Sequence, residues 1–223
     1  MTPPQKDADR SPSTKAIAVT SWQWPARNPC FVGRSVELLR LHGLLDLHSR
    51  VLIRGPMGIG KRSLACEYGH RFATQPLGRG RALRWATSRE LCERAPAAWE
   101  SGLLAIVDPP STAGDENQAR ALSALLRGAP GCRIVAIADS PSVLALAHEL
   151  QFAELTLPGL SVEAGLSLLI AASGRHRVPR DEQAAAADLV LALQGSPARL
   201  LEMAARAVAQ DLTWSECLRR NLL

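Results

Sequence analysis

Aromatic side chains and ordered cysteine patterns are both scarce in this sequence. Phe, Trp and Tyr make up 4% of the 223 residues, so a core must be built mainly from Leu, Ala, Val and Ile. The cysteines are odd in number, never form a CxxC pair and do not pair with histidines. This argues against a zinc site or a disulfide framework and predicts reduced, mostly buried thiols. The cysteines are Cys30, Cys66, Cys92, Cys132 and Cys217.

Long apolar runs are missing too. No stretch reaches the roughly 18 apolar residues that a membrane helix needs, and the N-terminus lacks the apolar segment of a secretory signal. Residues 1–20 are rich in Pro, Lys, Asp, Ser and Thr, which predicts a disordered leader, placed at residues 1–27. We therefore expect a cytoplasmic protein without a membrane partner.

The net charge is +5, which leaves a nucleic-acid partner open. The arginines, however, are spread evenly along the chain and are not interleaved with aromatic residues. This distribution favours ordinary solvated charge over a nucleic-acid groove.

Apolar runs alternate with helical patterns in the first two thirds of the chain. Such alternation predicts an α/β fold, with a parallel sheet and helices on both of its faces, over residues 28–160. The expected strands are 51–54, 82–86, 103–107, 134–138 and 155–157, and the expected helices are 35–47, 61–72, 117–126 and 141–150.

The pattern changes after Pro158. Three Ala- and Leu-rich segments follow with no strand between them, at 161–172, 180–193 and 197–209. Ser161 is expected to cap the first, and Gly174 and Gly195 are expected helix stops. Residues 161–223 are therefore predicted to form a small all-α domain.

A glycine-rich run follows the expected strand 51–54. It fits the first seven positions of the phosphate-binding pattern GxxxxGK, with a strand before it and a helix after it. Glycines let backbone N–H groups curl around phosphate oxygens, and the following helix directs its positive end at them. The lysine is expected to reach the β- and γ-phosphates. The residues are Gly55, Pro56, Met57, Gly58, Ile59, Gly60 and Lys61.

The pattern departs from a standard phosphate loop at the next residue. The position after the lysine is normally Ser or Thr, whose hydroxyl binds Mg²⁺. Here it is Arg62, and Ser63 follows one residue later, about 100° further round the helix. Arg62 either adds a charge near the phosphates or points outward, and Mg²⁺-dependent hydrolysis does not follow from this motif.

The run at 103–107 ends in Asp108. An acid that ends a buried strand downstream of a phosphate loop is placed to hold the metal and its water shell, so Asp108 is the candidate catalytic and metal-binding residue. An ordinary strand followed by a turn would give the same pattern of an apolar run ending in aspartate. The next position, where many ATPases carry a second acid, is Pro109, which can neither accept a proton nor orient water.

Five motifs occur in order along the chain: FVGRSVE at 31–37, the glycine-rich loop, Asp108, GCRIV at 131–135 and GSPA at 195–198. Together they resemble the NB-ARC (STAND) ATPases, the switch modules of apoptotic, plant-immunity and bacterial regulatory proteins, and the resemblance covers residues 28–210. It implies that Val32, Gly33 and Arg34 lie over an adenine, that residues 55–63 bind phosphates, and that Pro197 packs against the base. The helical domain would then correspond to the ARC1 domain of that family.

The resemblance implies an ATP/ADP-binding regulatory switch that hydrolyses slowly or not at all and acts with a protein partner or additional domains. Arg62, Pro109 and Asp139, which stands where the family carries a γ-phosphate-sensing arginine, all weaken hydrolysis, leaving at most a weak ATPase. A nucleotide-free interaction scaffold is the alternative. An active AAA-like ATPase acting on DNA or protein complexes is a third hypothesis.

Two tryptophans, Trp22 and Trp24, precede the expected domain. They either stack on a base or a partner, or cover the edge of the domain as apolar packing. Of the two, apolar packing is the interpretation that we favour.

Overall fold

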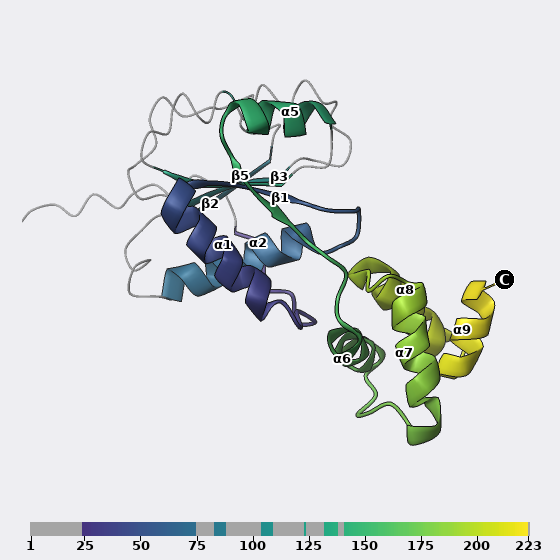
Figure 1. The fold of residues 1–223 in the computed structure, drawn as a ribbon. Coiled ribbons are helices and arrows are strands. Elements are labelled where there is room, and N and C mark those ends of the chain that lie inside the picture. Colours follow the sequence, from purple (N-terminus) through teal and green to yellow (C-terminus); the bar gives the residue numbers. More distant parts are fainter. Residues whose placement is uncertain are drawn as a thin grey trace, which may run out of the picture.

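The computed structural model describes residues 24–74, 83–87, 104–108, 123, 132–137 and 141–222. Figure 1 shows a sheet region followed by a group of helices. In chain order the elements are α1 (Ser35–His48), β1 (Arg50–Arg54), α2 (Lys61–Thr74), β2 (Leu83–Thr87), β3 (Leu104–Asp108), β4 (Arg133–Ile137), α5 (Pro141–Glu149), β5 (Ala153–Thr156), α6 (Val162–Ser173), the short 3-10 turn η1 (Arg180–Glu182), α7 (Gln183–Ala192), α8 (Pro197–Ala209) and α9 (Trp214–Leu222).

The sheet has five parallel strands in the order β2-β3-β4-β1-β5. β1 lies between β4 and β5, and its middle residues Val51, Leu52 and Ile53 are fully buried. A strand buried on both faces reads as a continuous apolar run, which is why the sequence predicts β1 so directly. The α/β fold class expected from the sequence is confirmed.

Helices cover both faces of the sheet. α1 and α2 lie on one face and α5 on the other (Figure 1). Leu41 and Leu45 of α1, Leu64 and Phe72 of α2, and the strands pack into one core in which these side chains are almost wholly buried. The segment 117–126, expected to be helical, lies outside the described residues apart from residue 123.

The helices α6 to α9 form a second core. Its members are small or aliphatic, apart from Trp214, which is fully buried, and Cys217. Ser161 caps α6 by accepting a hydrogen bond from the N–H of Ala164 at 3.2 Å, and Gly174 ends α6 in the left-handed conformation, as expected. None of the described helices combines the length and apolar character that crossing a bilayer requires.

α9 is a helix that the sequence analysis did not predict. Thr213 and Glu216 form a reciprocal cap at its start: the backbone N–H of each is bonded by the side chain of the other, at 2.9 and 3.2 Å. This is the capping-box pattern T-x-x-E, a signal that was present in the sequence.

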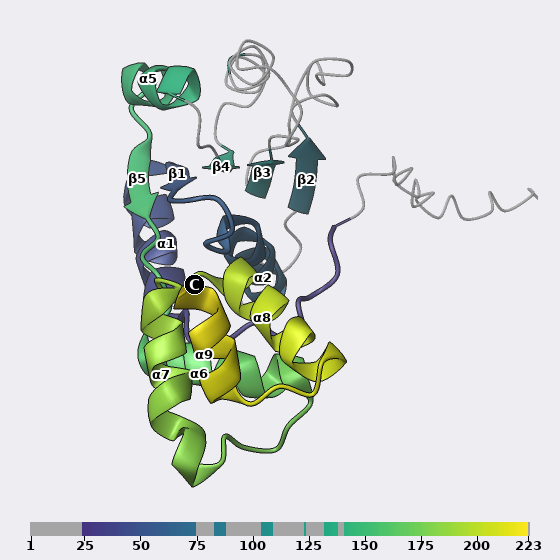
Figure 2. The same ribbon diagram turned by 90° about the vertical axis from the view of Figure 1, so that its right-hand side faces the viewer.

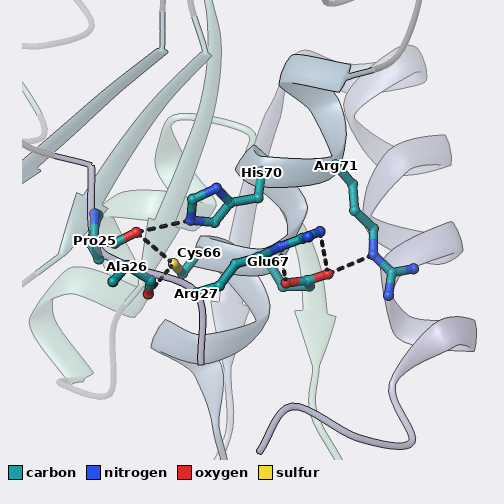
Figure 3. A network of polar contacts seen from close by, with 7 residues as sticks. All are labelled: Pro25, Ala26, Arg27, Cys66, Glu67, His70 and Arg71. Atoms are coloured by element: carbon teal, nitrogen blue, oxygen red, sulfur yellow. Dashed lines mark hydrogen bonds and ion pairs between the residues drawn. The ribbon is translucent and has the colours of Figure 1, made fainter. Parts of the chain in front are cut away.

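Residues 24–27 form an N-terminal strap along α2 (Figure 3). Trp24 lies against Gly69, where an added Cβ would collide with the indole ring, and meets Trp85 edge-to-face with ring centroids 5.5 Å apart. Arg27 binds the Glu67 carboxylate through two hydrogen bonds of 3.0 and 3.2 Å. The strap thus packs on the sheet region, although the sequence places it in the leader of residues 1–27, and Trp24 serves as apolar packing.

The strap also covers a thiol. Cys66 donates weakly to the carbonyl oxygens of Pro25 and Ala26 at 3.4 and 3.5 Å, and His70 contacts the Pro25 oxygen at 2.9 Å. Burial raises the pKa of the Cys66 thiol, as does the neighbouring Glu67 carboxylate, against the opposing charge of Arg27. Burial likewise raises the pKa of Cys217. Both thiols are protonated and poorly reactive at neutral pH.

Candidate functional site

The phosphate loop joins the end of β1 to the start of α2. Gly55, Gly58 and Gly60 have φ angles of 144°, 79° and 97°, a backbone region that residues with a side chain rarely adopt. The three glycines of the motif are therefore required by the shape of the loop. Met57, between the first two, is 90% exposed at its tip.

Lys61 is held inside this loop. Its side chain is 7% exposed, and Nζ donates to the carbonyl oxygens of Gly55 at 2.7 Å and Pro56 at 2.9 Å. The ammonium group therefore lies close to the turn and next to the positive end of α2. This places two favourable charges where the sequence predicts bound phosphates.

The residues after the lysine point in different directions. The Arg62 side chain is exposed. The Ser63 hydroxyl accepts a hydrogen bond of 3.5 Å from Nδ2 of Asn28, whose Oδ1 in turn accepts the N–H of Cys30 at 2.9 Å. Ser63 is thus turned toward the segment that precedes α1.

Asp108 is the last residue of β3, at the carboxyl end of the strand. β4 lies between β3 and β1, so Asp108 shares the edge of the sheet from which the phosphate loop leaves. Pro109 and Asp139 lie outside the described residues.

Arg34 connects three segments of the chain. It is buried, at 4% exposure, and its Nη2 donates to the carbonyl oxygens of Ile59 at 3.1 Å and Pro158 at 2.9 Å. Nη1 forms an ion pair of 2.9 Å with Glu37. We call this set of contacts the Arg34 clamp, because it ties the start of α1 to the phosphate loop and to the connection between β5 and α6. Sequence reasoning assigned Arg34 to an adenine site and missed the clamp.

The segment before Arg34 lies between the two cores. Phe31 packs against the core of the sheet region, whereas Cys30 and Val32 pack against the helical core. Gly33 touches α6 closely, because an added Cβ would collide with Ala164. The residues expected to cover an adenine are thus placed at the junction of the two regions.

The start of α8 lies directly on the phosphate loop, and Figures 1 and 2 show α8 beside the end of α2 that carries the loop. The N–H of Ala198 donates to the carbonyl oxygen of Gly58 at 3.1 Å. A Cβ added at Gly58 would stand 2.8 Å from that of Ala198, and one at Gly60 would stand 3.6 Å from Cγ of Pro197. The resemblance places Pro197 against a base; in this structure it lies over the loop.

Tyr68 is a buried titratable group of α2. Burial raises its pKa to about 12; Asp46 adds to the increase, and Arg133 opposes it. The hydroxyl lies 3.1 Å from Nδ1 of His42 on α1. Tyr68 therefore stays neutral and acts as a structural contact between α1 and α2.

No family model matches the sequence, and no curated protein matches it either. Solved structures do match in fold. A RuvB variant of Thermotoga maritima has a TM-score of 0.52 at 16% identity, over 86% of this chain and 69% of its own. A Walker-type ATPase of Pyrococcus abyssi has a TM-score of 0.53 at 14% identity, over 85% of this chain and 71% of its own.

A closed-state reconstruction of Hsp104 with ATPγS and FITC casein gives a TM-score of 0.59 at 17% identity. It covers 87% of this chain, which spans 42% of the Hsp104 chain. At such low identities these likenesses concern the fold alone. The chain has the P-loop NTPase fold: a parallel α/β sheet domain followed by a small helical domain.

Proposed function

We propose that this chain is an ATP- and ADP-binding regulatory switch module of the NB-ARC/STAND type, which hydrolyses nucleotide slowly or not at all. The observation that carries the proposal is the contact between Ala198 of α8 and Gly58 of the phosphate loop. A nucleotide whose phosphates enter this loop acts directly on a backbone group that also holds the helical domain.

The same observation gives the switch a mechanism. Residues 28–160 and 161–223 act as two domains, joined by the Ala198 contact and by a hydrogen bond of 2.8 Å from the N–H of Leu160 to the Gly195 oxygen. The Arg34 clamp fixes Pro158 in the connection that leads into α6. ATP and ADP differ in the phosphate nearest the loop, so they stabilise different arrangements of these contacts. Only such a difference in affinity can shift a conformational equilibrium.

The residues present fit nucleotide phosphates, because the loop has the required glycine conformations and an ammonium group held within it. Lys61 binds the phosphates and Asp108 is the acid of the site. Val32, Gly33 and Arg34 line the base at the domain junction, and Pro197 closes the site from the helical side. Weak or absent hydrolysis follows from Arg62, and from Pro109 and Asp139 in the sequence.

Thermal unfolding with ATP or ADP tests nucleotide binding. At about a hundred times Kd, a ligand that binds only the folded state adds roughly 2.7 kcal/mol, or about 5–10 °C in a chain of this size. The shift is expected in the wild type and is expected to be lost in Lys61→Ala. Arg206→Ala, which removes an exposed charge on α8, is the matched control and should keep the full shift.

Hydrogen exchange then tests the switch itself. The amide of Ala198 should exchange at different rates with ATP and with ADP, because its bond to the Gly58 oxygen belongs to one arrangement of the domains. Equal exchange rates with both nucleotides would leave a nucleotide-binding protein without a switch.

A nucleotide-free scaffold is the second candidate, favoured by one feature. Lys61 already donates to two loop carbonyl oxygens, and Pro197 and Ala198 already lie on the loop, so the site is closed as it stands. Absence of any nucleotide-dependent shift would support this candidate. In either case we expect a cytoplasmic protein that acts through a protein partner or through further domains.

An active ATPase is the third candidate. Its support is the fold likeness to RuvB and to Hsp104, together with Asp108. Steady ATP turnover well above that of an Asp108→Ala variant would favour it over the switch.

A further inference from the structure

We propose that this site binds nucleotide phosphates without Mg²⁺, and that the Arg62 guanidinium supplies the positive charge that the metal supplies in other phosphate loops. This inference rests on the proposed nucleotide binding and concerns the chemistry of the same site. The fold implies a bound Mg²⁺, but the residues at the metal-binding position of the motif do not fit a cation.

The metal-binding hydroxyl of the motif is replaced by a group that cannot bind a cation. Arg62 directly follows Lys61, at the position where phosphate loops carry Ser or Thr. A guanidinium has N–H donors and no acceptor, and it keeps its positive charge at any physiological pH. It therefore repels a divalent cation at the place where the motif would otherwise bind one.

The neighbouring hydroxyl does not compensate. Ser63 stands about 100° further round α2, and its hydroxyl is bonded to the Asn28 side chain at 3.5 Å. Asn28 is itself fixed, since its backbone oxygen accepts the N–H of Phe31 at 3.2 Å and its side chain accepts that of Cys30. Recruiting Ser63 to a metal would require its hydroxyl to turn away from this contact and toward the position that Arg62 occupies.

Arg62 is well placed for phosphate binding. It is the second residue of α2, and side chains leave a helix tilted toward its N-terminus, here the end that carries the phosphate loop. Lys61 is buried inside the loop whereas Arg62 is exposed. In the proposed site two cations flank the phosphates, Lys61 as a point charge inside the loop and Arg62 as a planar guanidinium outside it, which can bind two phosphate oxygens at once.

The consequence is a preference for metal-free nucleotides. Mg²⁺ bound to a nucleotide neutralises the oxygens that Arg62 would bind and brings a second cation close to the guanidinium. ADP carries one phosphate fewer than ATP and therefore holds Mg²⁺ less tightly. Excess Mg²⁺ should weaken the binding of ATP more than the binding of ADP, which makes the site selective for ADP when the metal is abundant.

Isothermal titration calorimetry with ATP and ADP, in EDTA or in excess Mg²⁺, tests the inference on the full chain. The wild type should bind at least as tightly in EDTA as in Mg²⁺. Arg62→Thr restores the hydroxyl of the motif; it should lose about tenfold to a hundredfold in affinity in EDTA, the worth of one charge-assisted hydrogen bond, and regain affinity when Mg²⁺ is added. Arg62→Lys keeps a charge and should show no gain from Mg²⁺.

Arg71→Thr is the control, because it makes the same substitution at an exposed arginine further along the same helix. Its affinities should follow those of the wild type in both buffers. Wild-type binding that requires Mg²⁺ would overturn the inference and leave the proposed function standing. No binding of either nucleotide in either buffer would remove the proposed function, and the inference with it.

Discussion

The phosphate loop is held from two sides, and the two sides differ in kind. On the sheet side it is continuous with β1 and α2, whose Leu52, Ile53 and Leu64 are fully buried. On the helical side it meets α8 through the hydrogen bond from the N–H of Ala198 to the Gly58 oxygen, and the segment before α1 packs Cys30 and Val32 against the helical core. One side is a continuous packed core, and the other combines a backbone hydrogen bond with a small apolar contact.

This difference suggests which part moves. The loop cannot leave β1 and α2 without exposing the core beneath it. Separating the helical side breaks a few hydrogen bonds, each worth about 1 kcal/mol net, and exposes the small apolar contact of Cys30 and Val32. We therefore expect the helical region, rather than the loop, to move.

The largest effect is expected from core truncation on each side. Trp214→Ala in the helical core and Phe72→Ala in the sheet core should each cost about 3–5 kcal/mol of unfolding free energy. If the two sides are separable, Trp214→Ala should remove exchange protection from α6 to α9 while β1 and α2 stay protected. Equal loss of protection in both regions would show a single cooperative unit.

The Arg34 clamp should give the next largest effect. Arg34→Met should lower the unfolding free energy by about 2–3 kcal/mol, because it removes charged donors from two carbonyl oxygens in a buried setting. Arg34→Lys should have a free energy of unfolding between those of the wild type and Arg34→Met. Arg40 is an exposed arginine of α1, and Arg40→Met should change the free energy of unfolding little. Urea unfolding of the four proteins measures these differences. An unchanged free energy of unfolding in Arg34→Met would mean that the clamp does not stabilise the connection between β5 and α6.

Alkaline pH should weaken the sheet side specifically. Burial raises the pKa of Tyr68 to about 12, so above pH 10 the unfolded chain loses this proton first. The contribution of Tyr68 to the free energy of unfolding is complete below pH 10. It falls between about pH 10 and 12, with a slope of at most about 1.4 kcal/mol per pH unit. The chain has one tyrosine, so the ultraviolet absorbance of tyrosinate follows it alone. Tyr68→Phe should flatten this part of the pH profile.

The ion pair of the strap should matter least. Arg27 is 57% exposed, and Glu67 keeps Arg71 as a second partner at 2.8 Å. Arg27→Ala should therefore cost less than about 1 kcal/mol, and the cost should shrink in high salt. A larger loss in thermal unfolding would mean that the strap holds the sheet side more firmly than this exposed pair allows.

Much of the fold could be predicted because glycine and proline mark the ends of many helices and strands in the sequence. The helix expected at 197–209 coincides with α8, and the strand expected at 51–54 differs from β1 by one residue. Apolar runs that end in glycine or proline mark such elements locally. The start of α9 is marked in the sequence by its capping box, Thr213 and Glu216, and not by an apolar run.

The site was predictable only where it is local. The glycines of the phosphate loop and Lys61 lie within seven residues, so spacing alone identifies them as a motif. The Arg34 clamp joins positions 25 and 124 residues apart, and the Ala198 contact crosses from one domain to the other. No periodicity in the sequence encodes such contacts, because they depend on how the two domains dock.

The strap carries a constraint on how this chain can evolve. Trp24 lies where any side chain at position 69 would have to go, so the two positions are not free to drift separately. A lineage that acquires alanine at position 69 must first, or at once, replace Trp24 by something smaller. In related sequences we therefore expect positions 24 and 69 to change together, so that a large residue at one position accompanies a small residue at the other.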